Sequence, residues 1–193
     1  MKPIEELYQR VISNLEANLP AWLTYHNAQH TRYVFDQSVF IGQMERLSEK
    51  DLYLLKLAAL FHDTGYLVNP QNHEEESCKI AEQELMNFGI TNEEFQLICG
   101  MIMATRLPQN PGTLPEMILA DADLEYLGTE KFSATSEKLF SELKHSRPDM
   151  TSDDWRKLQI DFLTKHSYFT AFCKNFREPI KRNHLKNLIE QGL

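Results

Sequence analysis

The segment Leu54-Leu55-Lys56-Leu57-Ala58-Ala59-Leu60-Phe61-His62-Asp63 is the most informative part of this chain. Its first eight positions are apolar apart from one lysine, which is typical of a helix at the centre of a helical bundle. A histidine and an aspartate follow back to back, so we expect His62 and Asp63 near the buried centre. Burying both without a partner costs several kcal/mol. A metal ion is the simplest partner, and a buried His–Asp hydrogen bond that caps the helix end is the alternative.

Helical periodicity continues on both sides of this stretch, and no convincing run alternates with period two as a strand would. The sequence therefore predicts an all-α fold. Caps and breakers place the helix boundaries: Asn27 is a good N-cap, Gly89 is a C-cap glycine, and Thr91 to Glu94 form a capping box. The expected helices cover about residues 3–19, 27–47, 51–61, 74–89, 91–105, 115–128, 130–145 and 153–176, with a short one after Pro179.

Length and composition favour one globular domain over residues 1–193, with 42% hydrophobic and 25% charged residues. The net charge of −8 and the pI of about 5.4 disfavour a duplex nucleic acid or an anionic membrane as partner. A small phosphorylated molecule is compatible with this charge if a local cation receives the phosphate.

Neither a signal peptide nor an apolar membrane span is evident, so a cytoplasmic location is expected. Cys78, Cys99 and Cys173 have no CxxC spacing, and we expect core packing rather than a disulfide framework or a thiolate zinc site. The oligomeric state stays open, with a homodimer among the candidates.

Upstream of the central run, Tyr25-His26-Asn27-Ala28-Gln29-His30 carries two histidines four residues apart. This spacing places both on one face at the start of a helix, so one could bind a metal and the other could do acid–base work. Alone, such a pair is weak evidence, because solvated histidines are the default.

Downstream, Asp121-Ala122-Asp123 follows the apolar residues Met117 to Ala120. Asp121 is three positions from both Ile118 and Leu124 and so shares a helix face with two apolar side chains. Asp123 is displaced by roughly 200° around the helix. We therefore expect Asp121 to be the metal ligand and Asp123 to be a supporting residue or the partner of a basic group.

Taken together, these segments resemble the HD superfamily of metal-dependent phosphohydrolases. The resemblance covers about residues 25 to 128 and implies an HD-domain helical bundle, which residues 129 to 193 would complete. It also implies a divalent metal ion, Mn, Fe, Ni, Co, Zn or Mg, as cofactor. The implied metal ligands are His30, His62, Asp63 and Asp121.

Two finer resemblances concern the reaction. Tyr25-His26-Asn27 with His30 is similar to a stretch of the cyclic-nucleotide phosphodiesterases, in which the first histidine is the general acid. The run from Asp121 to Gly128 is similar to that of small bacterial HD phosphohydrolases of undefined substrate. The Glu-Asp pair of (p)ppGpp hydrolases and the Gly-Tyr-Pro triplet of cyclic-di-GMP phosphodiesterases do not follow His62-Asp63 here, which disfavours both subfamilies.

Other residues could complete the site. His73 stands where binuclear members of the superfamily place a further histidine, so it is the candidate ligand of a second ion, although a solvated histidine is common in such a polar turn. Candidates for contact with the substrate phosphate are Thr105 and Arg106 after one expected helix, and His166 and Arg177 on one stripe of the expected helix over residues 153–176. A surface position for Arg106 and a snorkelling role for Arg177 are the alternatives.

The resemblance implies metal-assisted hydrolysis of a small phosphate ester, such as a nucleotide or a related phosphomonoester or phosphodiester. His26 and Asp63 would be the catalytic residues, with His26 protonating the leaving group. Two other functions stay open: an HD-fold sensor or ligand-binding module that keeps a structural metal without turnover, and a helical scaffold without metal.

Overall fold

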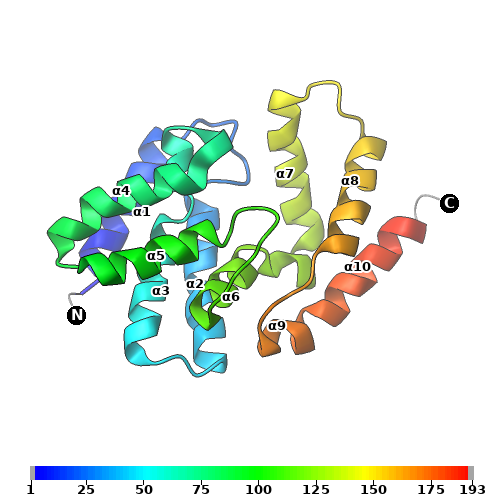
Figure 1. The fold of residues 1–193 in the computed structure, drawn as a ribbon. Helices are drawn as coiled ribbons and strands as arrows, with labels where there is room; N and C mark the ends of the chain where they lie inside the picture. Colours follow the sequence, from blue (N-terminus) through cyan, green and yellow to red (C-terminus); the bar gives the residue numbers. More distant parts are fainter. Residues whose placement is uncertain (1–2, 191–193) are drawn as a thin grey trace.

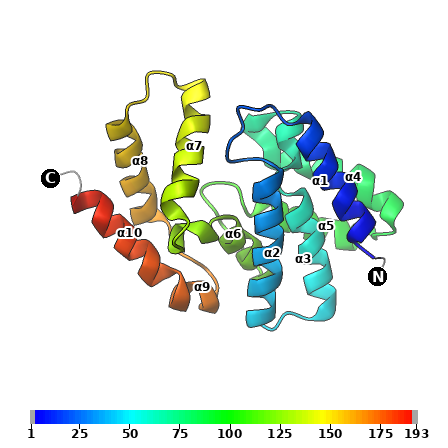
Figure 2. The same ribbon diagram turned by 180° about the vertical axis from the view of Figure 1, so that it is seen from behind.

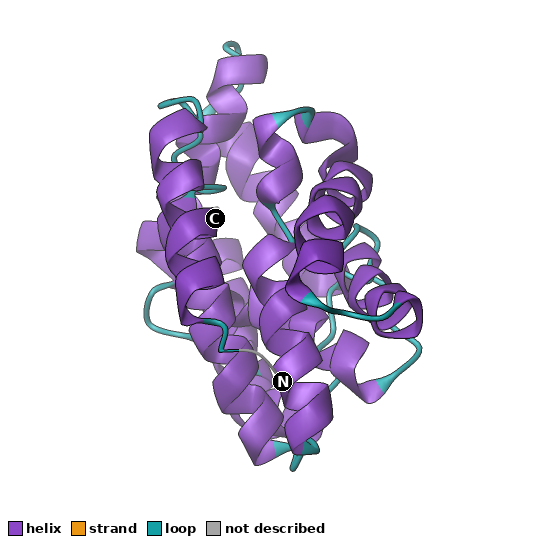
Figure 3. Cartoon of the chain, turned by 90° about the vertical axis from the view of Figure 1, so that its left-hand side faces the viewer, coloured by secondary structure: helices purple, strands orange, loops and turns teal. Residues whose placement is uncertain are grey.

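The computed structural model describes residues 3–190, and within them every regular element is a helix (Figure 3). The all-α prediction is confirmed. No helix in this range is long and apolar enough to cross a membrane. The α-helices are α1 (Glu5–Asn18), α2 (Ala28–Met44), α3 (Glu49–Phe61), α4 (His73–Phe88), α5 (Asn92–Met103), α6 (Leu114–Asp123), α7 (Phe132–Ser146), α8 (Ser152–Lys165), α9 (Ala171–Phe176) and α10 (Glu178–Glu190).

Local capping chemistry sets most of the helix starts. The Asn27 side chain accepts hydrogen bonds from the backbone N–H groups of Gln29 and His30, so it caps α2 as expected. Thr91 forms the predicted capping box of α5, and Thr113 forms a second one at the start of α6. Gly89 ends α4 with a φ of 88°, a left-handed conformation that glycine adopts without strain.

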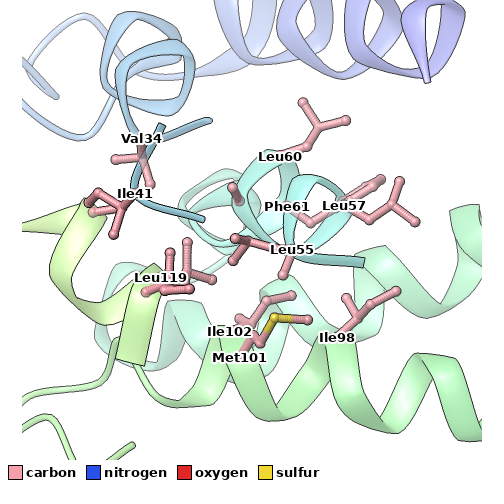
Figure 4. Close-up of a cluster of buried hydrophobic side chains, with 14 of the residues drawn as sticks. Val34, Ile41, Leu55, Leu57, Leu60, Phe61, Ile98, Met101, Ile102 and Leu119 are labelled. Carbon is pink, nitrogen blue, oxygen red and sulfur yellow. The ribbon is translucent and has the colours of Figure 1, made fainter. Parts of the chain in front are cut away.

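The apolar core is built around α3, as its sequence predicts. Leu55, Leu57, Leu60 and Phe61 are fully buried, because α2, α5 and α6 pack around this helix. Figure 4 shows these side chains in one cluster with Ile41 of α2 and the apolar side chains of α5 and α6. The end of α3, where His62 and Asp63 follow, is therefore held inside the bundle.

Two groups of helices lie side by side in the molecule (Figures 1 and 2). One group holds α1 to α6 and contains most of the core. The other holds α7, α8 and α10, with the short α9 at one end. Three short 3-10 turns, Thr64–Leu67, Pro70–Asn72 and Glu125–Gly128, connect helices near the boundary between the groups.

The chain departs from the predicted helices at two places. The helix expected over residues 115–128 ends at Asp123 and continues as a 3-10 turn. The helix expected over residues 153–176 is broken: α8 ends at Lys165, and α9 begins after Thr170, whose side chain caps it. The break has a physical cause, because the backbone N–H groups of Phe169 and Thr170 donate to the Asp121 carboxylate instead of to a helix carbonyl.

The expectation that the cysteines are plain core residues is wrong for two of the three. Cys78 of α4 and Cys99 of α5 form a disulfide, with Cα atoms 5.4 Å apart, whereas Cys173 is free and buried. The pairing follows from the packing of α4 on α5, which spacing in the sequence does not reveal.

Candidate metal centre

The ends of three helices bring the candidate ligands together. His30 lies in the first turn of α2, His62 and Asp63 follow the last turn of α3, and Asp123 is the last residue of α6. His30 Nε2 lies 3.0 Å from Asp123 Oδ1 and 3.5 Å from His62 Nε2. Asp63 Oδ2 lies 3.2 Å from His62 Nε2 and 3.4 Å from His30 Nε2. Two imidazoles and two carboxylates thus direct ligand atoms towards one point.

Hydrogen bonds fix how these ligand atoms are presented. His62 Nδ1 lies 2.9 Å from the backbone carbonyl of Ala59, which fixes a proton on Nδ1 and leaves the Nε2 lone pair facing the cluster. Ser77 holds the turn after α3, since its hydroxyl donates to the carbonyl of His62 and accepts from the N–H of Gly65. Gly65 also allows a close approach, because a Cβ atom there would lie 1.9 Å from the carbonyl oxygen of His73.

The cluster fits a divalent cation. Asp63 Oδ2 is buried without a hydrogen-bond partner, although a buried polar atom is normally paired. His30, His62 and Asp123 have ligand atoms within 4.8 Å of one another. Burial alone would raise the pKa of Asp63, but the adjacent His62 and His30 lower it, so the carboxylate stays ionised. A mixed set of imidazole and carboxylate ligands suits a transition-metal ion.

The prediction that Asp121 is the distal ligand is not met by the structure. Its carboxylate accepts hydrogen bonds from the Phe169 N–H at 2.9 Å, the Thr170 N–H at 2.8 Å and the Thr170 hydroxyl at 2.7 Å. Asp123, displaced around α6, faces the histidines instead. Both sides of α6 are covered by protein. The apolar neighbours of Asp121 in the sequence therefore did not show which of the two aspartates faces α2 and α3.

His26 lies beside this cluster without joining it. Its Nδ1 hydrogen-bonds to Glu142 of α7, and its ring stacks on Tyr66 with ring centroids 4.3 Å apart. Glu142 also accepts from the backbone N–H groups of Tyr25 at 2.9 Å and His26 at 3.0 Å. Burial lowers the pKa of His26, but the Glu142 hydrogen bond and nearby carboxylates outweigh burial, so the pKa is raised overall. His26 is therefore an oriented proton carrier.

His73 lies on the other side of Asp63. Its Nε2 is 3.6 Å from Asp63 Oδ1 and 3.5 Å from Glu74 Oε1, and its Nδ1 lies 3.1 Å from the Pro70 carbonyl oxygen. The structure thus brings His73 to Oδ1 of the Asp63 carboxylate, whereas Oδ2 faces His30 and His62. A role in metal binding stays a prediction.

The four candidates for phosphate contact fall into two pairs. Thr105 and Arg106 line the cavity beside the cluster, although Arg106 is paired with Glu75 at 2.5 Å and Glu74 at 3.6 Å. His166 and Arg177 do not line this cavity. His166 is held by Lys181, and Arg177 pairs with the buried Glu125. The stripe predicted to carry them does not exist, because α8 ends before His166.

One cavity of about 420 Å³ opens onto the cluster. At one end it is lined by His26, Asp63, His73 and Asp123, and at the other by side chains of α7 and α8. This volume falls within the range of small-molecule sites.

Comparison with known proteins agrees with this geometry. The sequence profile described as "HD domain" matches residues 27–125. The chain belongs to the HD domain family. Proteins with HD domains generally bind divalent metals and are metal-dependent phosphohydrolases in type. No curated protein matches the chain significantly.

Among solved structures, YpgQ of Bacillus subtilis, crystallised in complex with ADP, has a similar fold. The TM-score is 0.63 at 14% sequence identity, and the alignment covers 95% of this chain and 97% of YpgQ. At this identity the likeness supports the fold alone.

Sequence reasoning gave Asp123 only a supporting role in this HD domain site, and it missed two residues, Glu142 behind His26 and Ser77 behind His62. Glu142 had a readable signal, because it interrupts the apolar stripe of α7 between Leu139 and Leu143. Ser77 had no such signal, because a serine near the start of a helix is ordinary.

Proposed function

We propose that this HD domain protein is a metal-dependent phosphohydrolase that acts on a small phosphate ester. The observation that carries the proposal is the convergence of His30, His62, Asp63 and Asp123, with Asp63 Oδ2 buried and unpaired, next to a cavity that His26 also lines. Asp123 replaces Asp121 in the proposed ligand set.

A divalent ion held by these four residues would polarise the phosphoryl group and lower the pKa of a bound water. The protein's own residues then have separable roles. Glu142 and Tyr66 hold the His26 ring, and Glu142 fixes the proton on its Nδ1, so that Nε2 is the atom that can transfer a proton. We assign to His26 the protonation of the leaving oxygen, a step worth about 10²–10⁴ in rate.

The test compares His26→Ala with Asp63→Ala. His26→Ala is expected to keep metal binding and to lose about 10²-fold or more in activity on an alkyl phosphate, but less on para-nitrophenyl phosphate, whose leaving group needs little protonation. Asp63→Ala is expected to lose both metal and activity. Metal content by elemental analysis and a phosphatase panel with Mn²⁺, Co²⁺, Ni²⁺ and Mg²⁺ provide the measurements.

His145→Ala is the matched control, because this histidine stacks on Trp22 outside the cavity. It should behave as the parent in both assays. If wild type binds metal but hydrolyses no ester, the site is a binding module rather than an enzyme. Loss of metal in His26→Ala would move this residue into the ligand set and overturn its role as acid.

A further inference from the structure

The end of the cavity away from the metal cluster is an apolar chamber between α7 and α8. Phe132, Leu139 and Leu143 recur along α7 at spacings of seven and four, so they share one face. Trp155, Leu158 and Phe162 form the facing stripe of α8. The ring of Phe140 stacks on Trp155 with centroids 5.6 Å apart, which supports the indole in the wall.

Several of these apolar side chains are left uncovered by protein. Leu139, Leu143 and Phe162 are only partly buried although they face the cavity, and Leu158 is 37% exposed. Apolar surface of this kind, continuous with a polar site, is typical of a pocket that receives the organic part of a ligand.

Polar groups in the chamber are few and already engaged. The Gln159 amide donates to the Ser136 hydroxyl at 2.5 Å, and both residues are at least nine-tenths buried. A nucleobase carries several donors and acceptors on its edges, and most of them would lie against leucine side chains here. An unpaired buried polar group costs about 1–3 kcal/mol, so the chamber favours an apolar group over a base.

The charges at the metal-cluster end of the cavity limit the number of phosphate groups that a ligand can carry. Among the described residues that line the cavity, Arg106 is the one arginine or lysine, and it is paired with Glu75 and Glu74. One divalent ion together with Arg106 just balances the carboxylates of Asp63, Glu74 and Asp123. A triphosphate would bring further negative charges that this lining does not compensate, whereas sites for nucleoside triphosphates use lysines and arginines as well as metal.

We infer that the substrate is an ester with a single phosphate on a bulky apolar organic group, and that nucleoside polyphosphates are poor substrates. The inference rests on the phosphohydrolase function proposed above. In the reaction the oxygen of water bonds to phosphorus, the bond from phosphorus to the ester oxygen breaks, and that oxygen takes a proton. The products are an apolar alcohol or phenol and inorganic phosphate.

The kinetic test compares phenyl phosphate with 4-tert-butylphenyl phosphate, because the leaving groups are similar and the second adds only apolar bulk. In wild type with Mn²⁺, kcat/KM should rise by about tenfold or more with the tert-butyl group, since each buried carbon contributes a few-fold. ATP should be turned over at least about a hundredfold less efficiently than the tert-butyl ester, because its charges are uncompensated. If kcat/KM does not rise with the tert-butyl group, or if ATP is preferred, the inference about the substrate is wrong, although the proposed phosphohydrolase function would stand.

Variants locate the effect in the chamber. Leu139→Gln places an amide on the partly buried face of α7 and should bring the ratio of kcat/KM for the tert-butyl ester over phenyl phosphate close to one. Leu97→Gln is the matched control, because Leu97 is 53% exposed on α5 and does not line the cavity. Equal selectivity in the two variants would mean that the organic group does not bind between α7 and α8.

The nucleotide alternative has its own test. If AMP is preferred over the tert-butyl ester, and the preference falls in Gln159→Leu, then the Gln159–Ser136 pair recognises a base and the inference is wrong. The outcome expected here is that Gln159→Leu keeps or increases the preference for the apolar ester.

A binding measurement separates the substrate class from catalysis. Trp155 is one of two tryptophans, so a Trp22→Phe background makes its fluorescence specific for the chamber. The non-hydrolysable 4-tert-butylbenzylphosphonate should change this emission at concentrations where methylphosphonate does not. If the aryl phosphonate binds but no ester is hydrolysed with any metal, the proposed function fails and the chamber assignment holds. If it leaves Trp155 unchanged, the chamber assignment fails.

Discussion

The two groups of helices bury polar side chains in different ways. Around α2, α3 and α6, the ligand atoms of His30, His62 and Asp63 face a common point, and Asp63 Oδ2 has no hydrogen-bond partner. Where α8 to α10 meet α6, Asp121 and Lys181 are just as buried, but their charged groups have partners: Asp121 accepts three hydrogen bonds, and Lys181 pairs with Glu178 at 2.9 Å. Burial of a charge therefore does not identify a functional site; the convergence of several ligand atoms on one point beside a cavity does.

This difference predicts opposite consequences of substitution. Removing one member of a satisfied buried network leaves its partners unpaired and lowers the free energy of unfolding. Removing a carboxylate of the cluster loses its contacts with His30 and His62 in the metal-free protein, but its main cost is lost affinity for the ion. We therefore expect substitutions in the satisfied network to lower mainly the free energy of unfolding, and substitutions of the candidate ligands to lower mainly the affinity for metal.

The largest effect is expected for Asp63→Ala, because one oxygen of the Asp63 carboxylate lies close to His30 and His62 and the other lies close to His73. In wild type, an ion at a hundred times its Kd should stabilise the fold by about 2.7 kcal/mol. For a chain of this size that is a rise in Tm of roughly 5–10 °C. Asp63→Ala should show no such rise in Mn²⁺ or Ni²⁺ titrations followed by differential scanning fluorimetry. A full rise in this variant would contradict the ligand assignment.

A crossed pair of substitutions tests the comparison directly, because Asp121 and Asp123 lie on the same helix two residues apart. Asp121→Asn should lower the free energy of unfolding by about 1–3 kcal/mol, since both carboxylate oxygens accept from backbone N–H groups and an amide has only one acceptor oxygen. It should leave metal affinity near that of wild type. Asp123→Asn should lower metal affinity by about tenfold or more, an effect of the size seen when groups around metals are changed. It should lower the Tm of the metal-free protein less than Asp121→Asn does, because an asparagine oxygen can still accept a hydrogen bond from His30.

Calorimetric titration and thermal melts of the two variants, each with and without Mn²⁺, give both quantities. The assignment of Asp123 in place of Asp121 fails if the variants exchange these phenotypes.

What the sequence could predict was local. Helix ends governed by neighbours in the chain, such as Asn27 and Gly89, lie where expected, because a cap needs only the residues around it. The broken helix at residues 166–170 was not predictable, because its cause is Asp121, 48 and 49 positions away from the two backbone groups that it binds. Tertiary hydrogen bonds overrode a good helical pattern.

The candidate site shows the same division. His30, His62 and Asp63 could be read from the sequence, because two of them are adjacent and the third belongs to a spaced motif. Choosing between Asp121 and Asp123 requires knowledge of which side of α6 faces α2 and α3, and this is a property of the tertiary packing. Glu142 is 116 positions from His26, and no rule of spacing connects them.

Glu142→Gln probes the contact that joins the two groups of helices. Burial raises the pKa of Glu142, but its bond to His26 lowers it overall below the ordinary 4.5, while the pKa of His26 lies above its ordinary 6.5. The lowered acid contributes stability above pH 4.5, and the raised base contributes it below pH 6.5, with loss as the pH rises through the folded value. In metal-free protein, the deficit in Tm of Glu142→Gln against wild type should be greatest between these values and should shrink in alkaline solution. A deficit that is constant with pH would mean that Glu142 acts only through its bonds to backbone N–H groups.

The smallest effect is expected for Arg177→Lys. The sequence predicted that Arg177 contacts the substrate phosphate, whereas in the structure it pairs with Glu125. The guanidinium pairs with this buried carboxylate and lies over the Phe172 ring at 5.2 Å, so the site is an anchor between α9 and the turn after α6. Lysine keeps the charge but loses the planar fork and the ring contact, which should lower the free energy of unfolding by about 1 kcal/mol. That is roughly 2–4 °C in Tm.

KM should stay unchanged for every ester, because Arg177 does not line the cavity. Arg182→Lys, on the exposed side of α10, should change neither quantity. A raised KM in Arg177→Lys without a change in Tm would mean that Arg177 contacts the substrate. The contrast between the satisfied network and the metal site would then not hold for this residue.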